Sequence, residues 1–244
     1  RADIYSLIHY TTLHSNHSIL NHSSSSYIAV ADRVLGVTPG TDANKWQLVA
    51  QGDSGAVLTT RGDILFQDLD SSPLCDAIEL VTPGYKNANF SHVGVIVEIK
   101  DSNNINGNYN FKESLKVLEA IPDKVKITRL DSFLNRSFDI NNKPKVIVGR
   151  LKKEYRYLIK DAINFMKNKL GFKYDDEFLL NNNMYYCSEL IYEAFLEDTI
   201  FKLYPMTFLH PKTKDTLNIW KDYYSKLKIK IPENQLGINP GIMS

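Results

Sequence analysis

The chain has 244 residues, of which 43% are hydrophobic and 23% charged, a composition typical of a globular protein with a substantial core. Its 29 basic residues nearly balance its 28 acidic ones and no segment carries a basic stripe, so we expect no extended nucleic-acid surface. No run of 18 apolar residues occurs, which argues against a transmembrane segment, and no cleavable signal sequence is recognisable.

The first 57 residues differ in character from the rest. Short β-type runs at 27–31 and 46–50 are separated by a Pro/Gly turn at 36–41, which predicts a small β-rich module or a linker. His14 and His17 are three residues apart, but no acidic residue lies near them, so we expect no metal site there. The Gly-Asp-Ser-Gly quartet at 52–55 resembles the nucleophile segment of trypsin-like proteases. Too little chain precedes it to build their double barrel, and a turn is predicted instead.

Residues 58–244 alternate between strand-like and helix-like patterns. This alternation predicts an α+β domain in which a mostly antiparallel sheet packs against helices. The polar stretch 101–110 is predicted to be the turn of a long hairpin. Strands are predicted over 63–67, 90–99, 116–121, 125–127 and 146–150, and helices over 76–82, 130–134, 155–170 and 216–227.

Cys187 is the strongest candidate for chemistry. Polar residues precede it, and apolar residues then recur at 190, 191, 194 and 195, which is one face of a helix. Cys187 is therefore expected in the first turn, where free backbone N–H groups and the helix dipole favour a thiolate. The alternative is a buried structural cysteine. The other cysteine, Cys75, shows no sign of pairing with it, and we expect both thiols to be free.

A thiol nucleophile needs a base within hydrogen-bond reach. Outside the first 57 residues the chain has two histidines, and His210 precedes a proline in a predicted loop. His92, in contrast, begins the strongest predicted strand, which alternates three valines on one face with His92 and Gly94 on the other. The glycine would let another group approach closely, so His92 is the predicted base.

A third group should orient the imidazole. Glu98 lies on the same strand but about 20 Å away, whereas Glu119 on the return strand would lie opposite or diagonal to His92, with Cβ atoms about 5–8 Å apart. The apolar neighbours of Glu119 indicate a buried carboxylate, which is rarely tolerated without a partner. Glu119 is the predicted third group, with Asp63 and Gln67 as alternatives.

Five motifs, taken in chain order, look like those of the YiiX-like proteins, which are circularly permuted papain-fold cysteine hydrolases of the NlpC-type superfamily. The resemblance covers about residues 60–242, and as in that family the histidine strand precedes the cysteine helix. It implies that Cys187, His92 and Glu119 form a catalytic triad. The motifs are Gly62–Gln67, Ser91–Val95, Leu118–Ala120, Tyr174–Asp175 with Phe178, and Tyr186–Leu190.

The resemblance also implies substrate-binding roles for Gln67, Tyr174 and Tyr186, and neither a cofactor nor a metal is expected. We expect the oxyanion hole to consist of backbone N–H groups at the start of the cysteine helix, aided by Tyr186 or Gln67.

The function implied by this resemblance is that of a thiol peptidase or amidase acting on a peptide or amide substrate, with peptidoglycan peptides favoured. One alternative is a lipid acyl hydrolase or acyltransferase that uses the same triad, with Phe178, Leu179 and Leu180 lining an acyl pocket. Another alternative is a catalytically inactive binding component of a tail or surface assembly, which the β-rich first module motivates.

Overall fold

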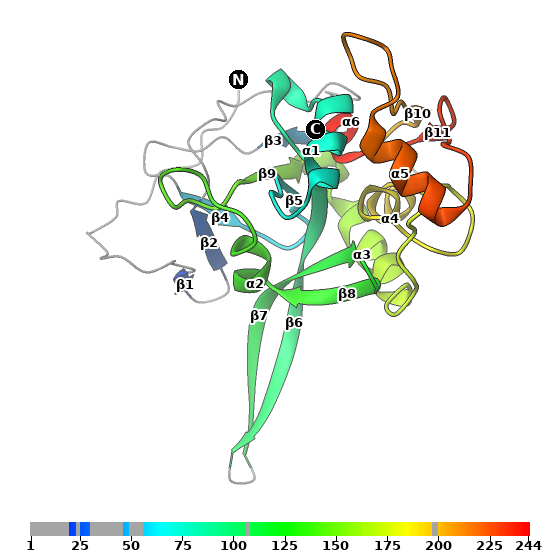
Figure 1. Cartoon of the computed structure of the whole chain (residues 1–244). Coiled ribbons are helices and arrows are strands. Elements are labelled where there is room, and N and C mark those ends of the chain that lie inside the picture. The colour runs from blue at the N-terminus through cyan, green and yellow to red at the C-terminus, as the bar shows by residue number, and fades with distance from the viewer. Residues whose placement is uncertain (1–19, 23–24, 30–45, 49–55, 106–107, 197–199) are drawn as a thin grey trace.

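The structure is a computed structural model, and it describes residues 20–22, 25–29, 46–48, 56–105, 108–196 and 200–244. His14, His17 and the quartet at 52–55 lie outside these residues. A central sheet is packed between helices, and a long two-stranded hairpin projects from the body (Figure 1). None of the described helices is long and apolar enough to cross a membrane.

Six strands form the central sheet in the order β3-β9-β5-β6-β7-β8. Every neighbouring pair is antiparallel. The strand that begins at His92 is therefore an inner strand, and its run of valine and isoleucine suits a pleated position buried on both faces. The predicted α+β class with a mostly antiparallel sheet is confirmed. The strands are β3 (Trp46–Leu48), β5 (Ile64–Gln67), β6 (His92–Ile105), β7 (Asn108–Ile121), β8 (Lys124–Arg129) and β9 (Val146–Leu151).

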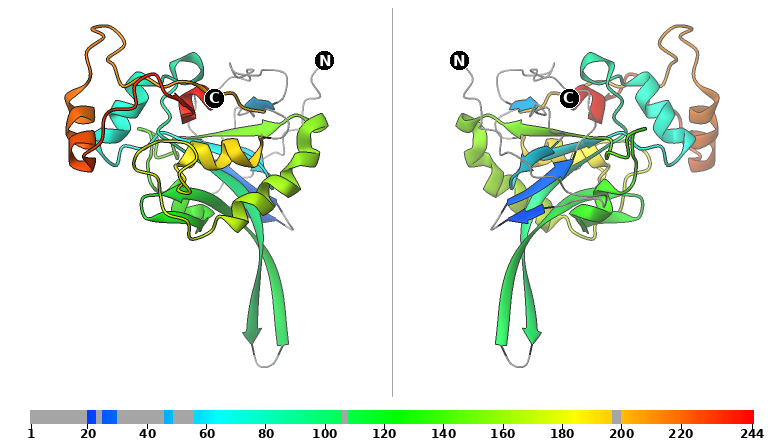
Figure 2. Two further views of the ribbon diagram at one scale, coloured as in Figure 1. Left: turned by 90° about the vertical axis from the view of Figure 1, so that its right-hand side faces the viewer. Right: turned by 90° about the vertical axis from the view of Figure 1, so that its left-hand side faces the viewer.

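Helices α3 (Ile159–Asn168) and α4 (Cys187–Ala194) cover one face of the sheet (Figure 2). The alternation of β6 directs Val93, Val95 and Val97 to this face, where they join the buried apolar side chains of both helices in one core. Burial of this surface holds α4 against the sheet, and so positions the first residue of α4 relative to β6.

The opposite face is covered by α2 (Leu130–Leu134), whose bounds match the predicted ones. Gly94 points to this side, and a Cβ on it would lie 2.5 Å from Val117 Cγ1 and 3.4 Å from Glu119 Cβ. The absence of a side chain at Gly94 therefore lets β7 approach β6 closely, as the sequence indicated. Because residues two apart on a strand share a face, His92 lies on this side as well.

A separate apolar cluster joins α1 (Pro73–Val81) to α5 (Asn218–Leu227). Trp220 and Tyr224 of α5 pack with Phe208 in edge-to-face contacts. Residues between α4 and the C-terminus thus fold back beside α1 at the end of the sheet. The remaining elements of this region are η1 (Tyr85–Asn87), β10 (Tyr204–Pro205), which pairs with β11 (Leu236–Gly237), and α6 (Pro240–Met243).

The predicted loop at 101–110 is wrong over most of its length. Strand β6 continues to Ile105 and β7 begins at Asn108, and the two pair as far as Ile105 and Asn108. Apolar alternation reports burial of one face rather than strand formation itself. In a hairpin that projects beyond the core, the two strands can pair through their backbones without apolar residues at alternate positions. The apolar alternation therefore ends at residue 99, although the strands continue to residues 105 and 108.

The predicted helix over 155–170 is divided into two parts. A 3₁₀ segment, η2 (Lys153–Leu158), precedes α3. In it the Arg156 side chain donates to the Leu151 carbonyl at 3.0 Å, so this turn is tied back to the end of β9. The tighter winding of η2 lies at a helix N-terminus, where such turns are frequent.

The strands of the first 57 residues pair in two places. The strands β1 (Leu20–His22), β2 (Ser25–Ala29) and β4 (Ala56–Thr59) form an antiparallel sheet of their own. Strand β3 instead pairs with β9 at the edge of the central sheet. The division into a module at 1–57 and a domain at 58–244 stays a prediction.

Candidate active site

Cys187 is the first residue of α4, where the sequence analysis placed it. The preceding residue, Tyr186, is extended, and its carbonyl accepts the N–H of Leu190 as the first intrahelical bond. The N–H groups of the first turn therefore have no partner within the helix. Together with the helix dipole they favour negative charge on the sulfur and on an oxygen held beside it. Cys187 and Cys75 are both free thiols.

His92 connects the start of this helix to the sheet. Its imidazole is hydrogen-bonded to Glu119 and lies close enough to the Cys187 sulfur for the two groups to interact electrostatically. The Nε2 atom lies 2.7 Å from Glu119 Oε2, which leaves Nδ1 as the ring nitrogen available to the thiol. In the antiparallel β6–β7 register Val95 pairs with Leu118. Glu119 therefore lies opposite Gly94, which is diagonal to His92. The structure thus brings Cys187, His92 and Glu119 together, all of them buried.

The charges of this group follow from its contacts. Burial by itself lowers the pKa of His92, but the hydrogen bonds with Cys187 and Glu119 outweigh it and raise the pKa of His92 to about 9. Burial acts in the opposite sense on Glu119, yet the hydrogen bonds from Arg136 and His92 lower the pKa of Glu119 to about 2. At neutral pH the imidazole is therefore protonated and the carboxylate ionised, which suits a thiolate beside the imidazolium.

Two further side chains form hydrogen bonds to Glu119, and neither was predicted from the sequence. Arg136, in the loop after α2, places Nη1 at 2.7 Å from Oε2 and Nη2 at 2.5 Å from Oε1, and Thr128 on β8 donates to Oε1. Thr128 could have been found, because it shares a strand face with Lys126, the residue opposite Glu119. Arg136 lies in a polar segment without periodicity, so no sequence signal pointed to it.

Three other candidates make different contacts. Gln67 pairs with His92 in the β5–β6 register, and its Nε2 donates to a backbone carbonyl of α2 at 2.8 Å, so it lies beside the imidazole. Asp63 is held by Arg150 at 2.7 and 2.6 Å. His210 lies in a turn, where its Nδ1 accepts backbone N–H groups of residues 212 and 213.

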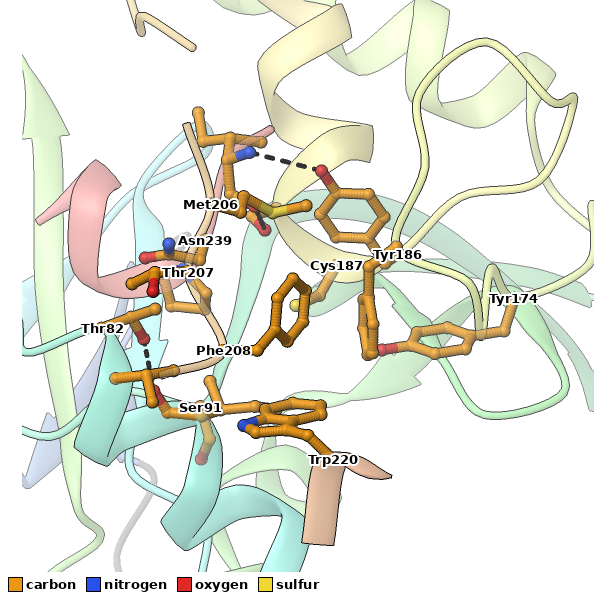
Figure 3. Close-up of a pocket in the computed structure, with 16 residues that line it drawn as sticks. Thr82, Ser91, Tyr174, Tyr186, Cys187, Met206, Thr207, Phe208, Trp220 and Asn239 are labelled. Carbon is orange, nitrogen blue, oxygen red and sulfur yellow. Dashed lines mark hydrogen bonds between the residues drawn. The ribbon is translucent and has the colours of Figure 1, made fainter. Parts of the chain in front are cut away.

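A pocket of about 510 Å³, including its open mouth, lies beside Cys187 (Figure 3). Tyr174 and Tyr186, both named from the sequence, line it. Phe178 lines it as well, whereas Leu179 and Leu180 are not part of the wall, and neither is Gln67.

Most of the pocket wall comes from parts of the chain that the sequence did not connect with Cys187. These parts are α1, α5 and the segments 206–208 and 238–240. The pairing of β10 with β11 brings the two segments together. The described residues that form the wall include aromatic, aliphatic and neutral polar side chains, and none of them is Lys, Arg, Asp or Glu.

The Glu189 side chain caps the start of α4. Its Oε2 accepts the Tyr186 N–H at 3.3 Å. Burial, and next the nearby Asp175 carboxylate, raise the pKa of Glu189 from 4.5 to about 9, so it is protonated at neutral pH.

Glu189→Gln should therefore keep or raise the Tm at pH 7, because the neutral amide needs no proton on folding, whereas Glu189→Ala should lose about 1 kcal/mol with the lost cap. The pKa of Glu189 is higher in the folded state than in the unfolded state. Its contribution to stability is therefore complete below about pH 4.5 and is lost as the pH rises through about 9. Melting curves of the wild-type chain should thus fall towards pH 9 more steeply than those of the Gln variant. Equal losses in both variants at pH 7 would contradict a protonated cap.

Comparisons with known proteins identify the family of the chain. A family model described as a permuted papain-like amidase enzyme of the YaeF/YiiX, C92 family matches residues 58–239, more than half of the chain. The chain belongs to this family. It is accordingly a papain-like cysteine peptidase or amidase, as the resemblance implied, and the permuted papain-like fold is confirmed.

One solved structure supports the same fold for this permuted papain-like amidase. It is that of the metalloprotein yiiX from Escherichia coli O157:H7, which matches with a TM-score of 0.52 and 23% identity over 75% of this chain and 91% of the other. No curated protein matches the chain. Within the described parts of the chain no group of three or more His, Cys, Asp or Glu side chains is arranged to hold a metal ion.

Proposed function

We propose that Cys187, His92 and Glu119 are the catalytic triad of an amidase that cleaves a peptide or related amide bond, with cell-wall peptides as the favoured substrates. The observation that carries this proposal is that the His92 imidazole is hydrogen-bonded to a buried carboxylate and interacts on its other side with the thiol at the start of α4. The permuted papain-like family supports amide chemistry at this thiol.

The reaction follows from the charges of these groups. The Cys187 thiolate attacks the amide carbonyl carbon, and the oxygen becomes an oxyanion next to the first-turn N–H groups of α4. His92 then donates its Nδ1 proton to the leaving amine as the C–N bond breaks, which leaves a thioester on Cys187. Water, deprotonated by His92, attacks the thioester, releases the carboxylic acid and restores the thiolate–imidazolium pair. Glu119 keeps the Nε2 proton in place throughout.

Tyr174 and Tyr186 are proposed to contact the substrate from the pocket wall. The Tyr186 hydroxyl accepts the N–H of Ile238 at 3.3 Å, so the ring is fixed while its face borders the pocket. Gln67 is proposed to support the imidazole rather than the substrate, because it pairs with His92 across the sheet.

A second candidate function is acyl-ester hydrolysis or acyl transfer by the same triad. The uncharged, aromatic wall of the pocket favours it, because such a wall suits an acyl chain better than the carboxylates of a stem peptide. Two side chains of the wall, Trp220 and Asn239, have Nε1 and Nδ2 donors without hydrogen-bond partners among the described residues. These donors would suit the carbonyl oxygen of an amide or ester.

Product analysis separates the two candidates. The purified chain should be incubated with peptidoglycan fragments and, separately, with phospholipid vesicles, and the products identified by mass spectrometry. Release of a peptide amine supports the amidase, and release of fatty acid supports the acyl reaction. Enzyme alkylated with iodoacetamide in a Cys75→Ala background provides the blank, because Cys187 is then the only thiol.

The inactive-binding alternative is tested by the thiol itself. In the Cys75→Ala background, Cys187 should react with iodoacetamide at neutral pH, and His92→Ala should reduce the rate at least tenfold because the imidazolium no longer stabilises the thiolate. Equal rates in both proteins would reject the triad and favour a binding component.

A further inference from the structure

The carboxylate of Glu119 is fully occupied by its neighbours. Oε2 receives His92 Nε2 and Arg136 Nη1, and Oε1 receives Arg136 Nη2 and the Thr128 hydroxyl. A carboxylate offers about four lone-pair sites, so all of them are used. The bidentate Arg136 contact fixes the plane of the carboxylate as well as its charge. Rotation of Glu119 away from His92 would break every one of these bonds.

Arg136 and His92 are also held by the same aromatic ring. The Arg136 guanidinium lies 5.0 Å from the centre of the Phe133 ring, and the His92 ring lies 5.7 Å from it. Phe133 is fully buried in α2, whereas the Arg136 side chain is 23% exposed. The guanidinium therefore closes the site on the side of α2, opposite the helix that carries Cys187.

Arg136 supplies a second positive charge beside Glu119. The imidazolium and the carboxylate cancel one another, so a thiolate formed at Cys187 in the proposed reaction would leave one negative charge buried at a cost. The guanidinium brings the sum of the four groups to zero. Among the described residues, the hydrogen-bond partners of Glu119 are His92, Thr128 and Arg136, and Thr128 is neutral.

We propose that Arg136 is a positioning residue of the reaction, which keeps Glu119 ionised and aligned so that His92 presents Nδ1 to Cys187. This inference rests on the proposed triad and extends it to a fourth side chain. The competing explanation is that Arg136 only anchors the loop after α2 and stabilises the fold.

The rate of Cys187 alkylation by iodoacetamide tests the proposal without any substrate. It should be measured from pH 4 to pH 10 in the Cys75→Ala background for wild type, Arg136→Met and Arg136→Lys. Without the guanidinium, buried Glu119 gains a proton at acidic pH and the imidazolium loses its partner. The pH of half-maximal alkylation should therefore rise by at least one unit in Arg136→Met and by less in Arg136→Lys.

Arg150→Met is the matched control, because Arg150 makes an equally close pair with buried Asp63 in the same sheet. It should lower the Tm but leave the alkylation midpoint unchanged. In a Glu119→Gln background, Arg136→Met should cause no further shift, since Arg136 acts through Glu119.

The outcomes separate the two proposals. A wild-type Cys187 that is unreactive at neutral pH would overturn the triad itself. A reactive wild type with an unshifted midpoint in both Arg136 variants would overturn only the role of Arg136. If Arg136→Met does not fold, the midpoint of Arg136→Lys decides, and an unshifted value counts against the proposal.

Discussion

Cys187→Ala should reduce turnover by about a thousandfold or more, to the level that substrate binding and the backbone N–H groups alone sustain. The sulfur is the only atom at the start of α4 that can form the thioester, so no neighbour can replace it. The same change should lower the pKa of His92 from about 9, because the hydrogen bond with Cys187 is the strongest influence that raises it.

Both effects can be measured on one preparation. The kcat/KM of the better substrate reports the first, and the titration of the His92 ring signals by NMR reports the second. Cys75→Ala is the matched control, because Cys75 is also a buried free thiol but lies on α1 and does not line the pocket beside Cys187. Full activity in Cys187→Ala, or loss of activity in Cys75→Ala, would exclude Cys187 as the nucleophile.

Glu119→Gln should reduce kcat by roughly 10²–10⁴-fold, because a neutral amide no longer holds the Nε2 proton or stabilises the imidazolium. In the pH profile of kcat/KM, the decrease on the alkaline limb reports the loss of the His92 proton. We expect this decrease near pH 9 in the wild-type chain. In the Gln variant this limb should move to lower pH, since one of the two bonds that raise the pKa of His92 is weakened. An unchanged limb with unchanged kcat would remove Glu119 from the triad.

The same substitution should also change stability, and the sign of the pH dependence is fixed. The pKa of Glu119 is lower in the folded state, about 2 against 4.5, so its contribution is present above pH 4.5 and is lost as the pH falls towards 2. The shift corresponds to about 3 kcal/mol. Denaturant unfolding should show the Gln variant clearly weaker than wild type at pH 7, with the difference shrinking towards pH 2.

Much of the fold was predictable because an element with one buried face carries apolar residues at regular intervals in its sequence. The alternation in β6 follows from one face packing on α3 and α4, and the spacing after Cys187 follows from one face of α4 packing on the sheet. The hairpin beyond Ile99 left no such trace, because residues 100–104 are polar in sequence while pairing of the backbone continues there. The predicted loop failed for this reason.

Those residues of the candidate site whose positions depend on neighbours in sequence could be predicted. Cys187 at a helix start, His92 at a strand start and Glu119 on the next strand each follow from neighbours in sequence. The side chain of Arg136 and the pocket wall at 206–208 and 238–240 reach the site through tertiary packing alone, by way of the loop after α2 and of the pairing between β10 and β11. No local pattern encodes contacts of this kind.

The pocket wall and the proton-handling groups belong to different stretches of chain. His92, Glu119 and Arg136 come from one continuous region that spans β6, β7 and the loop after α2, and none of them lines the pocket, whereas seven of the sixteen lining residues come after residue 200. Substitutions after residue 200 can therefore change part of the surface that a substrate would meet and leave the proposed triad and Arg136 unaltered.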